Sequence, residues 1–206
     1  GHFNRESRGF VLRKILVVAQ FGFSIFFIIG TVIIFNQIFF LKNKETGYDK
    51  ERIVTIRLRT GSEKFYMQFK NQLLMGSKIQ GVSGMSTQLP FFGWRTNESD
   101  WQGKDPDYHG DICFSHIDYD FLETLDIELV EGRNFSRDFS TDANSFIVNE
   151  TLANLMDTAF VIGKRLMINE QTGPVIGVMK DFIFNRPDLE EIQPLAFMLG
   201  PDKVSF

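Results

Sequence analysis

The feature that most constrains the fold is an uninterrupted apolar run near the start of the chain. No residue from Ile15 to Leu41 is charged. As a helix rising 1.5 Å per residue, the part from Ile15 to Phe35 alone would be about 31 Å long, which matches the hydrocarbon thickness of a bilayer. The sequence therefore predicts a transmembrane helix over residues 15–41, preceded by a short flank at residues 1–14.

Two other structures could contain such a run. A signal peptide has a shorter apolar region of about 7 to 15 residues and ends in a small-residue cleavage site. Here the run is longer, and Phe39-Phe40-Leu41-Lys42 offers no such site. A helix buried in a soluble core is the second alternative, but uncharged runs of this length are typical of membrane spans. We therefore favour the spanning helix.

The basic residues that flank the run do not decide which end faces the cytoplasm. The positive-inside rule compares the Lys and Arg residues on the two sides of a span. Four stand on each side, namely Arg5, Arg8, Arg13 and Lys14 before the run and Lys42, Lys44, Lys50 and Arg52 after it. Charge alone leaves the orientation open.

A narrow polar stripe follows one side of the predicted helix. Gln20, Ser24 and Thr31 fall within 40° of one another at 100° per residue. Polar side chains at membrane depth usually face other helices, and Gly22 and Gly30 would permit close approach nearby. We therefore expect the helix to pack in a bundle with further helices of a longer protein. Simple tolerance of these groups in lipid remains the alternative.

The composition of the remaining chain is that of a water-soluble domain. With 43% apolar residues, the 206-residue chain can bury a core of ordinary size. The net charge is −4, and the 22 Lys and Arg residues are scattered without a basic stripe, so we expect no nucleic-acid partner. The single cysteine, Cys113, excludes an internal disulfide and any CxxC zinc or redox motif.

Hydrophobic periodicity predicts an α+β fold over residues 42–206. Strands are expected at Arg52–Leu58, Val82–Gln88, Asp111–Ile117, Ser145–Asn149, Arg165–Asn169, Pro174–Lys180 and Pro194–Leu199. Helices are expected after a Ser62 cap to an end near Gly76–Gly81, at Asp118–Leu125, at Glu150–Asp157 and from Pro187 to about Ile192. This mixture of strands and helices is typical of layered α/β packing.

The stretch from Leu89 to Gly110 breaks this pattern with Pro, Gly, Trp and charged residues. We interpret it as a long loop or a small inserted lobe, at about residues 89–110. Its aromatic residues could mark a contact surface or form a small local core. They are Phe91, Phe92, Trp94 and Trp101.

No set of residues predicts catalysis, a cofactor or a metal site. His109, Cys113 and His116 are close in sequence, but Cys113 and His116 would point to opposite faces of a strand. The acid pairs, Asp118 with Asp120 and Glu190 with Glu191, fit helix capping and the helix dipole better than acid-base chemistry. The segment Ile162–Arg165 lacks the glycine loop and hydroxyl of a nucleotide-binding P-loop.

Five features occur in an order that resembles the MacB-like periplasmic core domain of ABC-transporter permeases, the family that includes FtsX and LolC/LolE subunits. They are LDIELVEGRNF (125–135), FIVNETLA (146–153), IGK (162–164), VIGVMKDF (175–182) and IQPL (192–195). The beginning also fits, since Leu12-Arg13-Lys14 precedes Ala19-Gln20-Phe21 and the apolar run. The resemblance covers nearly the whole chain and is weakest from Leu89 to Gly110.

The resemblance implies a fragment of a permease in the bacterial inner membrane, with residues 1–14 cytoplasmic and residues 42–206 forming a mixed α/β periplasmic domain without an active site. Expected partners are a separate cytoplasmic ATPase, a second permease copy or paralogue, and membrane lipid. ATP hydrolysis would move the helices and thereby the outer domain, for export or mechanotransmission. A membrane-anchored extracytoplasmic sensor or ligand-binding domain is the alternative.

Within these motifs we expect structural residues only. Gly132 would form a turn at a strand end, Asn149 would cap a helix, and Gly177 would allow close backbone approach. The complete set is Gly132, Arg133, Phe135, Asn149, Glu150, Gly163, Lys164, Gly177, Asp181 and Pro194.

Overall fold

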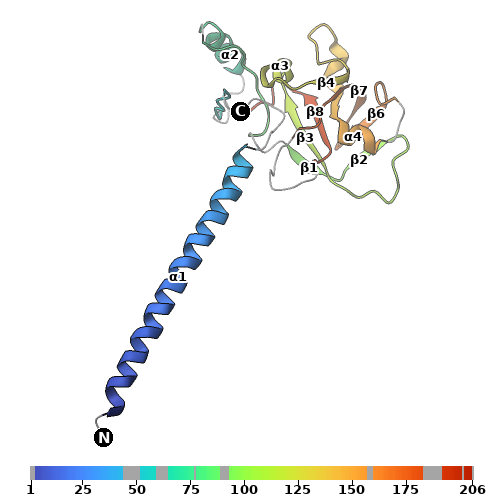
Figure 1. Ribbon diagram of the computed structural model, residues 1–206. Helices are drawn as coiled ribbons and strands as arrows, with labels where there is room; N and C mark the ends of the chain where they lie inside the picture. The colour runs from blue at the N-terminus through green and yellow to red at the C-terminus, as the bar shows by residue number, and fades with distance from the viewer. Residues whose placement is uncertain are drawn as a thin grey trace. The chain divides into compact units, whose positions relative to one another are not determined.

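The protein consists of two compact units, residues 1–44 and residues 45–206. The computed structural model describes residues 3–43, 52–58, 65–76, 78–88, 93–156, 160–182, 192–200 and 202–205 (Figure 1). Each unit is considered separately below.

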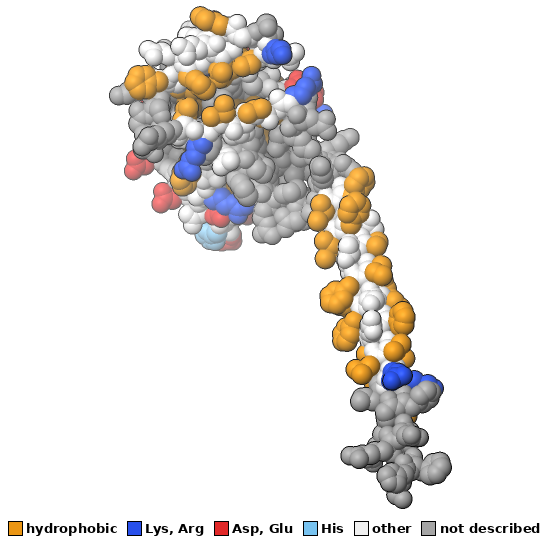
Figure 2. Space-filling view, turned by 90° about the vertical axis from the view of Figure 1, so that its left-hand side faces the viewer, with side chains coloured by type: hydrophobic (Ala, Val, Ile, Leu, Met, Phe, Trp, Pro, Cys, Tyr) orange, Lys and Arg blue, Asp and Glu red, His pale blue; other side chains and the backbone are white. Residues whose placement is uncertain are grey.

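The first unit is a single long helix, α1 (Phe3–Asn43). Its part from Arg13 to Phe40 is long and apolar enough to cross a membrane, with a mean hydropathy of 2.3. None of that window is buried inside the protein, which argues against a helix hidden in a soluble core. Figure 2 shows apolar side chains on the visible face of α1 and basic side chains toward one end. A helix with this all-round apolar surface suits lipid.

The second unit is built on an eight-stranded mixed sheet (Figure 1). The strand order is β1-β3-β8-β5-β7-β6-β2, and β4 pairs with β7 beside this path. β3 runs parallel to β8 and β5 runs parallel to β7, while the other pairs are antiparallel. The strands are β1 (Trp94–Thr96), β2 (Ser99–Trp101), β3 (Ile112–Ile117), β4 (Leu129–Gly132), β5 (Phe146–Asn149), β6 (Arg165–Ile168), β7 (Gln171–Met179) and β8 (Leu195–Leu199).

Short helices connect the strands. They are α2 (Tyr66–Leu74), α3 (Phe121–Leu125), the 3-10 helix η2 (Ser140–Asn144) and α4 (Glu150–Leu155). The α3 helix ends at Asp126, whose backbone is left-handed with φ 56°. At this residue the helix stops and the chain turns toward β4, so α3 remains a little over one turn long.

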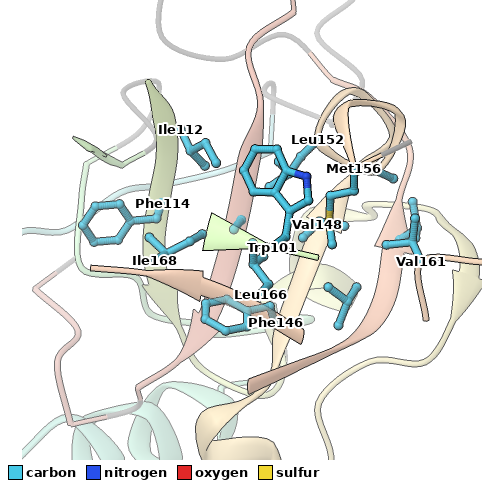
Figure 3. Packing of buried hydrophobic residues seen from close by; sticks show 14 of the residues in the cluster. Trp101, Ile112, Phe114, Phe146, Val148, Leu152, Met156, Val161, Leu166 and Ile168 are labelled. Carbon is cyan, nitrogen blue, oxygen red and sulfur yellow. The ribbon is translucent and has the colours of Figure 1, made fainter. Parts of the chain in front are cut away.

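Alternate residues of the central strands enter two different hydrophobic cores. In β8, Leu195, Phe197 and Leu199 join a core that includes α3, whereas Ala196 and Met198 join a core that includes α4. Figure 3 shows the second core, in which Trp101, Phe146 and Leu152 come from β2, β5 and α4. Since both faces of the sheet are covered, β8 is apolar throughout instead of alternating with polar residues.

The structure confirms most of the predicted elements in the second half of the chain. The strands β3, β5, β6 and β8 and the helices α3 and α4 lie within their predicted ranges. β7 starts at Gln171, three residues before the predicted Pro174, because it also pairs with β6 as a hairpin. Asn169, with φ 51°, supplies the left-handed residue of the connecting turn.

Two predicted strands are wrong. Residues Arg52–Leu58 form no strand, and the segment is largely exposed. Its contacts with the rest of the domain include Ile53, which packs against the core that includes α3, and the Leu58 N–H, which donates to the Ser205 carbonyl at 2.8 Å. The segment Val82–Gln88 contributes only an isolated bridge between Met85 and Ile117. Arg52–Leu58 has an alternating pattern, but no strand in the described part of the chain pairs with it.

The stretch from Leu89 to Gly110 contains regular structure that its composition did not predict. β1 adds to one end of the sheet through β3, and β2 adds to the other end through β6. Other expectations lie outside the described residues, namely the Ser62 cap and the helix from Pro187 to about Ile192. The described N-cap residue of α2 is Phe65, which makes no side-chain cap.

Candidate functional site

Asn149 lies where β5 ends and α4 begins, and its side chain is fully buried. Its Oδ1 accepts from the Leu152 N–H at 3.0 Å, which is the expected helix cap, and from the Leu195 N–H at 2.9 Å. Its Nδ2 donates to the Gln193 carbonyl at 3.0 Å and to Asp181 Oδ1 at 2.7 Å. One amide therefore joins β5, α4, the start of β8 and the end of β7.

Asp181 and Glu150 extend this junction on the other side of α4. The Thr151 hydroxyl donates to Asp181 Oδ2 at 2.7 Å, and the Thr151 N–H donates to Asp181 Oδ1 at 3.1 Å. In return, the Asp181 N–H donates to Glu150 Oε2 at 3.0 Å. These contacts satisfy free N–H groups in the first turn of α4, and the two carboxylates suit its positive end.

Arg133 follows β4 and binds a buried carboxylate of η2. Its Nη1 lies 2.7 Å from Asp142 Oδ2 and its Nη2 lies 2.7 Å from Asp142 Oδ1. The guanidinium also covers the Phe139 ring, 4.2 Å from its centroid. A planar guanidinium that holds a carboxylate with two parallel bonds fixes both groups in direction as well as distance.

Gly132 and Gly177 face each other across β4 and β7. Gly132 has φ 78°, and a Cβ there would collide with the Ile176 carbonyl oxygen. A Cβ on Gly177 would lie 2.5 Å from the Arg133 carbonyl oxygen. The two backbones approach so closely that neither position has room for a side chain, in agreement with the turn and the close approach expected from the sequence.

The remaining motif residues lie at turns and in the core. Phe135 is buried in the core beside α3. Gly163, with φ 83°, and Lys164 form the turn before β6, where the Lys164 N–H donates to the Val161 carbonyl at 3.0 Å. The Pro194 carbonyl accepts from the Cys113 N–H at 2.9 Å at the start of the β3–β8 pair.

A second polar cluster, which the sequence did not reveal, joins α2 to the start of α3. Lys70 and Asp118 are almost completely buried, at 4% and 2% exposure. The Lys70 Nζ lies 2.6 Å from Asp118 Oδ2 and 2.5 Å from Asp120 Oδ2. The capping expectation is wrong for Asp120, whereas Asp118 Oδ1 does accept from the Asp120 N–H at 3.1 Å at the start of α3. Asp120 is the N-cap residue of α3, but its carboxylate makes no cap bond and instead binds cations.

Hydroxyl groups and a second cation complete this cluster. Tyr66 and Ser83 both donate to the Asp118 carboxylate, while Arg137 binds both oxygens of Asp120. Burial, together with the hydrogen bond to Asp118, raises the pKa of the Tyr66 hydroxyl far above its ordinary value. The hydrogen bond from Arg137 outweighs partial burial and lowers the pKa of Asp120. Tyr66 is thus a fixed neutral donor, and Asp120 a stable anion.

The residues that could suggest a metal site are not brought together. Within the described ranges, no group of three or more His, Cys, Asp or Glu residues could hold a metal ion. Cys113 is buried in the core beside α3, and His109 is exposed. His116 is half-buried. Burial, helped by the charge of Lys203, lowers its pKa to about 4.

The two tryptophans of the aromatic stretch have different surroundings. Trp101 is buried in the core beside α4 and packs edge-on against Tyr108, with 5.8 Å between the ring centroids. Trp94 in β1 is 63% exposed. The interpretation as a local core thus fits Trp101, and the interpretation as an exposed surface fits Trp94. Phe91 and Phe92 lie outside the described residues.

The polar residues of α1 lie on an exposed helix surface. The Ser24 hydroxyl donates to the Gln20 carbonyl at 2.9 Å, and the Thr31 hydroxyl donates to the Phe27 carbonyl at 2.7 Å. Both hydroxyl protons are used within the helix. Of the three side chains, only the Gln20 amide has two N–H donors and a carbonyl to offer another helix.

The polar clusters of the second unit are alike in that their carboxylates are held by several hydrogen-bond donors. The Thr151 and Ser83 hydroxyls donate to the carboxylates of Asp181 and Asp118, but each carboxylate also accepts from other groups that hold it in place. Such closed networks fix segments relative to one another. The arrangement suits a rigid framework better than acid-base or nucleophilic catalysis.

Comparison with known protein families gives one match, which covers most of the chain. The family model of the MacB-like periplasmic core domain matches residues 16–198. No curated protein matches the chain.

Several solved structures resemble the chain at low identity. One is the periplasmic region of MacB from Actinobacillus actinomycetemcomitans, with 15% identity and a TM-score of 0.46 over 75% of this chain and 62% of that one. Another is the extracellular domain of the noncanonic ABC-type transporter YknZ from Gram-positive bacteria, with 17% identity and a TM-score of 0.47 over 75% and 70%. A domain of a putative permease protein from Porphyromonas gingivalis has 21% identity and a TM-score of 0.39 over 62% and 54%.

Proposed function

Because the chain belongs to the family of MacB-like periplasmic core domains of ABC-type transporter permeases, we propose that it couples ATP-driven movement of membrane helices to an outer domain. In this proposal α1 spans the bacterial inner membrane, and the sheet domain lies in the periplasm. A separate cytoplasmic ATPase and a second permease copy or paralogue complete the transporter. The outer domain contributes to export or to force transmission and catalyses no reaction itself.

The observation that carries this proposal is the pairing of an exposed apolar helix with a domain whose buried polar groups are engaged in structural bonds. Asn149 alone joins four segments, and Arg133 fixes the end of β4 to η2. A domain tied together in this way moves as one body when a helix attached to it moves. This property is what a mechanical relay requires and what a hinged ligand-binding domain would lack.

The bundle packing expected for α1 belongs to the same proposal. Since the Ser24 and Thr31 hydroxyls bond within α1, we infer that the Gln20 amide provides the main hydrogen bonds to a neighbouring helix. Ser24 and Thr31 then contribute chiefly by being small enough to let that helix approach.

Purification of the full-length protein from native membranes tests the assignment. A tagged protein solubilised in mild detergent should retain an ATPase subunit, and the purified complex should hydrolyse ATP. Recovery of the protein with a cytoplasmic signalling enzyme, and without any ATPase, would overturn the proposal in favour of the sensor alternative. The wild-type protein carrying its tag at the other terminus serves as the control for a tag that blocks assembly.

A further inference from the structure

Helix α2 is attached to the sheet domain by polar side chains. Its two buried residues are Tyr66 and Lys70, which lie on one face of the helix because they are four positions apart. Neither of the two described hydrophobic cores includes a residue of α2. The contacts that hold the helix include those of Tyr66 and Lys70 with the Asp118 cluster and that of the Tyr66 ring with Gly84, while Phe69 and Leu73 are half-buried.

The exposed face of α2 is mixed, with the polar Gln68, Asn71 and Gln72 beside apolar side chains. Met67 and Leu74 are exposed, as are the flanking residues Phe65 and Met75. An ordinary surface helix turns its apolar stripe inward and its polar side outward. In α2 one of the two buried side chains carries a charge, which is unusual at an inward-facing position.

The charges of the cluster balance within a short distance. Lys70 and Arg137 provide two cations, and Asp118 and Asp120 provide two carboxylates. Only Lys70 comes from α2, so the helix can leave with one cation while Arg137 remains on Asp120. Buried ion pairs of this kind add little net stability compared with apolar contacts, but they fix one arrangement strongly while both partners are present.

We propose that α2 is a detachable element, held on the sheet domain by the Lys70–Asp118 pair as a latch and able to leave while the sheet stays folded. In the docked state Lys70 and Tyr66 close over the Asp118 carboxylate. In the released state water solvates these groups, and both hydrophobic cores remain intact because α2 contributes no described residue to them. If the proposed transport function holds, we expect movement of α1 to promote release of α2, the next described helix along the chain.

Hydrogen exchange of the whole chain in lipid nanodiscs, followed by mass spectrometry, measures the release of α2 directly. The backbone amides at the C-terminal end of α2 should exchange at least about tenfold faster than those of β5 and β8, because local opening requires less free energy than global unfolding. Lys70→Met should speed exchange in α2 by about a further tenfold and leave β5 and β8 unchanged. Lys78→Met, at an exposed lysine nearby, is the matched control and should change neither.

A second variant guards against simple misfolding of Lys70→Met. In the double variant Lys70→Met with Asp118→Asn, the unpaired buried charge is gone, and the amide oxygen introduced at position 118 can still accept from Ser83 and the Asp120 N–H. Exchange in α2 should then slow toward the wild-type rate, since the loss in the single variant comes from the partner left alone.

Two results would overturn the latch. One is α2 amides that exchange at the same rate as those of β8 in the wild-type chain. The other is an equal acceleration of α2, β5 and β8 in Lys70→Met that the double variant does not reverse. Because exchange is measured without an ATPase, a failed search for that partner would refute the proposed function and leave the latch unaffected.

Discussion

Arg133 and Asp142 face each other through two hydrogen bonds of 2.7 Å, and the Asp142 side chain is completely buried. The pair closes the loop between β4 and β5, because Asp142 also accepts from the Ser136 N–H at 2.9 Å. A buried carboxylate with three directed donors holds this loop in one conformation.

Arg133→Met should destabilise the domain by about 2–3 kcal/mol, because it leaves the buried Asp142 carboxylate without its cation. The arginine is itself 39% exposed, which keeps the expected loss below that of a fully buried pair. Urea unfolding followed by circular dichroism measures the change. Arg165→Met, at an exposed position of β6, is the control and should stay within about 0.5 kcal/mol of wild type. Equal effects of the two substitutions would contradict the structural role of the pair.

The stability difference between wild type and Arg133→Met should shrink as the pH falls from about 6 to about 3. Burial alone would raise the pKa of Asp142, but the hydrogen bonds from Arg133 and Ser136 lower it below its ordinary value. In the wild type this contribution is complete above the unfolded-state pKa of about 3.9 and is lost as the pH falls through the folded-state pKa. In the variant, protonation instead relieves an unpaired charge. Urea midpoints at several pH values test this, and a constant difference would refute it.

Asn149→Ala should cost about 3 kcal/mol, since it removes the α4 cap and leaves the Leu195 N–H without its acceptor. Asn154→Ala is a matched control, because Asn154 is exposed in the same helix. Its effect should not exceed about 0.5 kcal/mol. Thermal and urea unfolding of both variants provide the comparison, and a loss for Asn149→Ala as small as that of the control would show that the junction is dispensable.

Gly132→Ala should be more destabilising than Gly163→Ala, although both positions have left-handed backbones with φ 78° and 83°. A Cβ on Gly163 meets nothing within 4 Å, so that variant reports the backbone strain alone, about 1–2 kcal/mol. At Gly132 the added methyl group also collides with the Ile176 carbonyl oxygen. If the two variants unfold at the same urea concentration, the close approach of β4 and β7 does not exclude a side chain at position 132.

Gln20→Leu combined with Ser24→Leu should weaken assembly of the full-length transporter in detergent or bilayers. The reason is loss of the interhelical hydrogen bonds that we assign to the Gln20 amide, each worth about 0.6–2 kcal/mol. Ile25→Leu with Ile29→Leu alters the opposite side of α1 conservatively and should leave assembly unchanged. Native mass spectrometry or cross-linking gives the subunit ratio, and unchanged assembly in the first pair would rule out the packing role.

Sequence patterns predicted the parts of this fold that depend on local hydrophobicity. The uncharged run predicts α1, and the apolar segments ending at Ile117 and Asn149 predict β3 and β5, because each strand carries its own burial signal. Arg52–Leu58 has the same alternation but is not a strand, since strand formation also requires a partner. Periodicity contains no information about that partner.

The short strands β1 and β2 and the Lys70–Asp118 pair could not be predicted from local hydrophobicity, for a different reason. β1 and β2 have three residues each, too few to show a period, and their pairing with β3 and β6 is set by the rest of the sheet. Lys70 and Asp118 are 48 residues apart, so nothing near either residue marks the other as its partner. The Asn149 cap was predictable because the acceptor and the N–H of Leu152 are only three residues apart.

Because the residues of β8 alternate between the two cores, this strand cannot tolerate a one-residue shift in register. Loss of one residue before Leu195 would place Phe197 where Ala196 now lies, so a bulky ring would enter the space of a methyl group while a void opened on the other side. Length variation among natural or engineered versions should therefore be confined to the connections outside the strands. The interior sheet should evolve only by exchanges that preserve volume at each position.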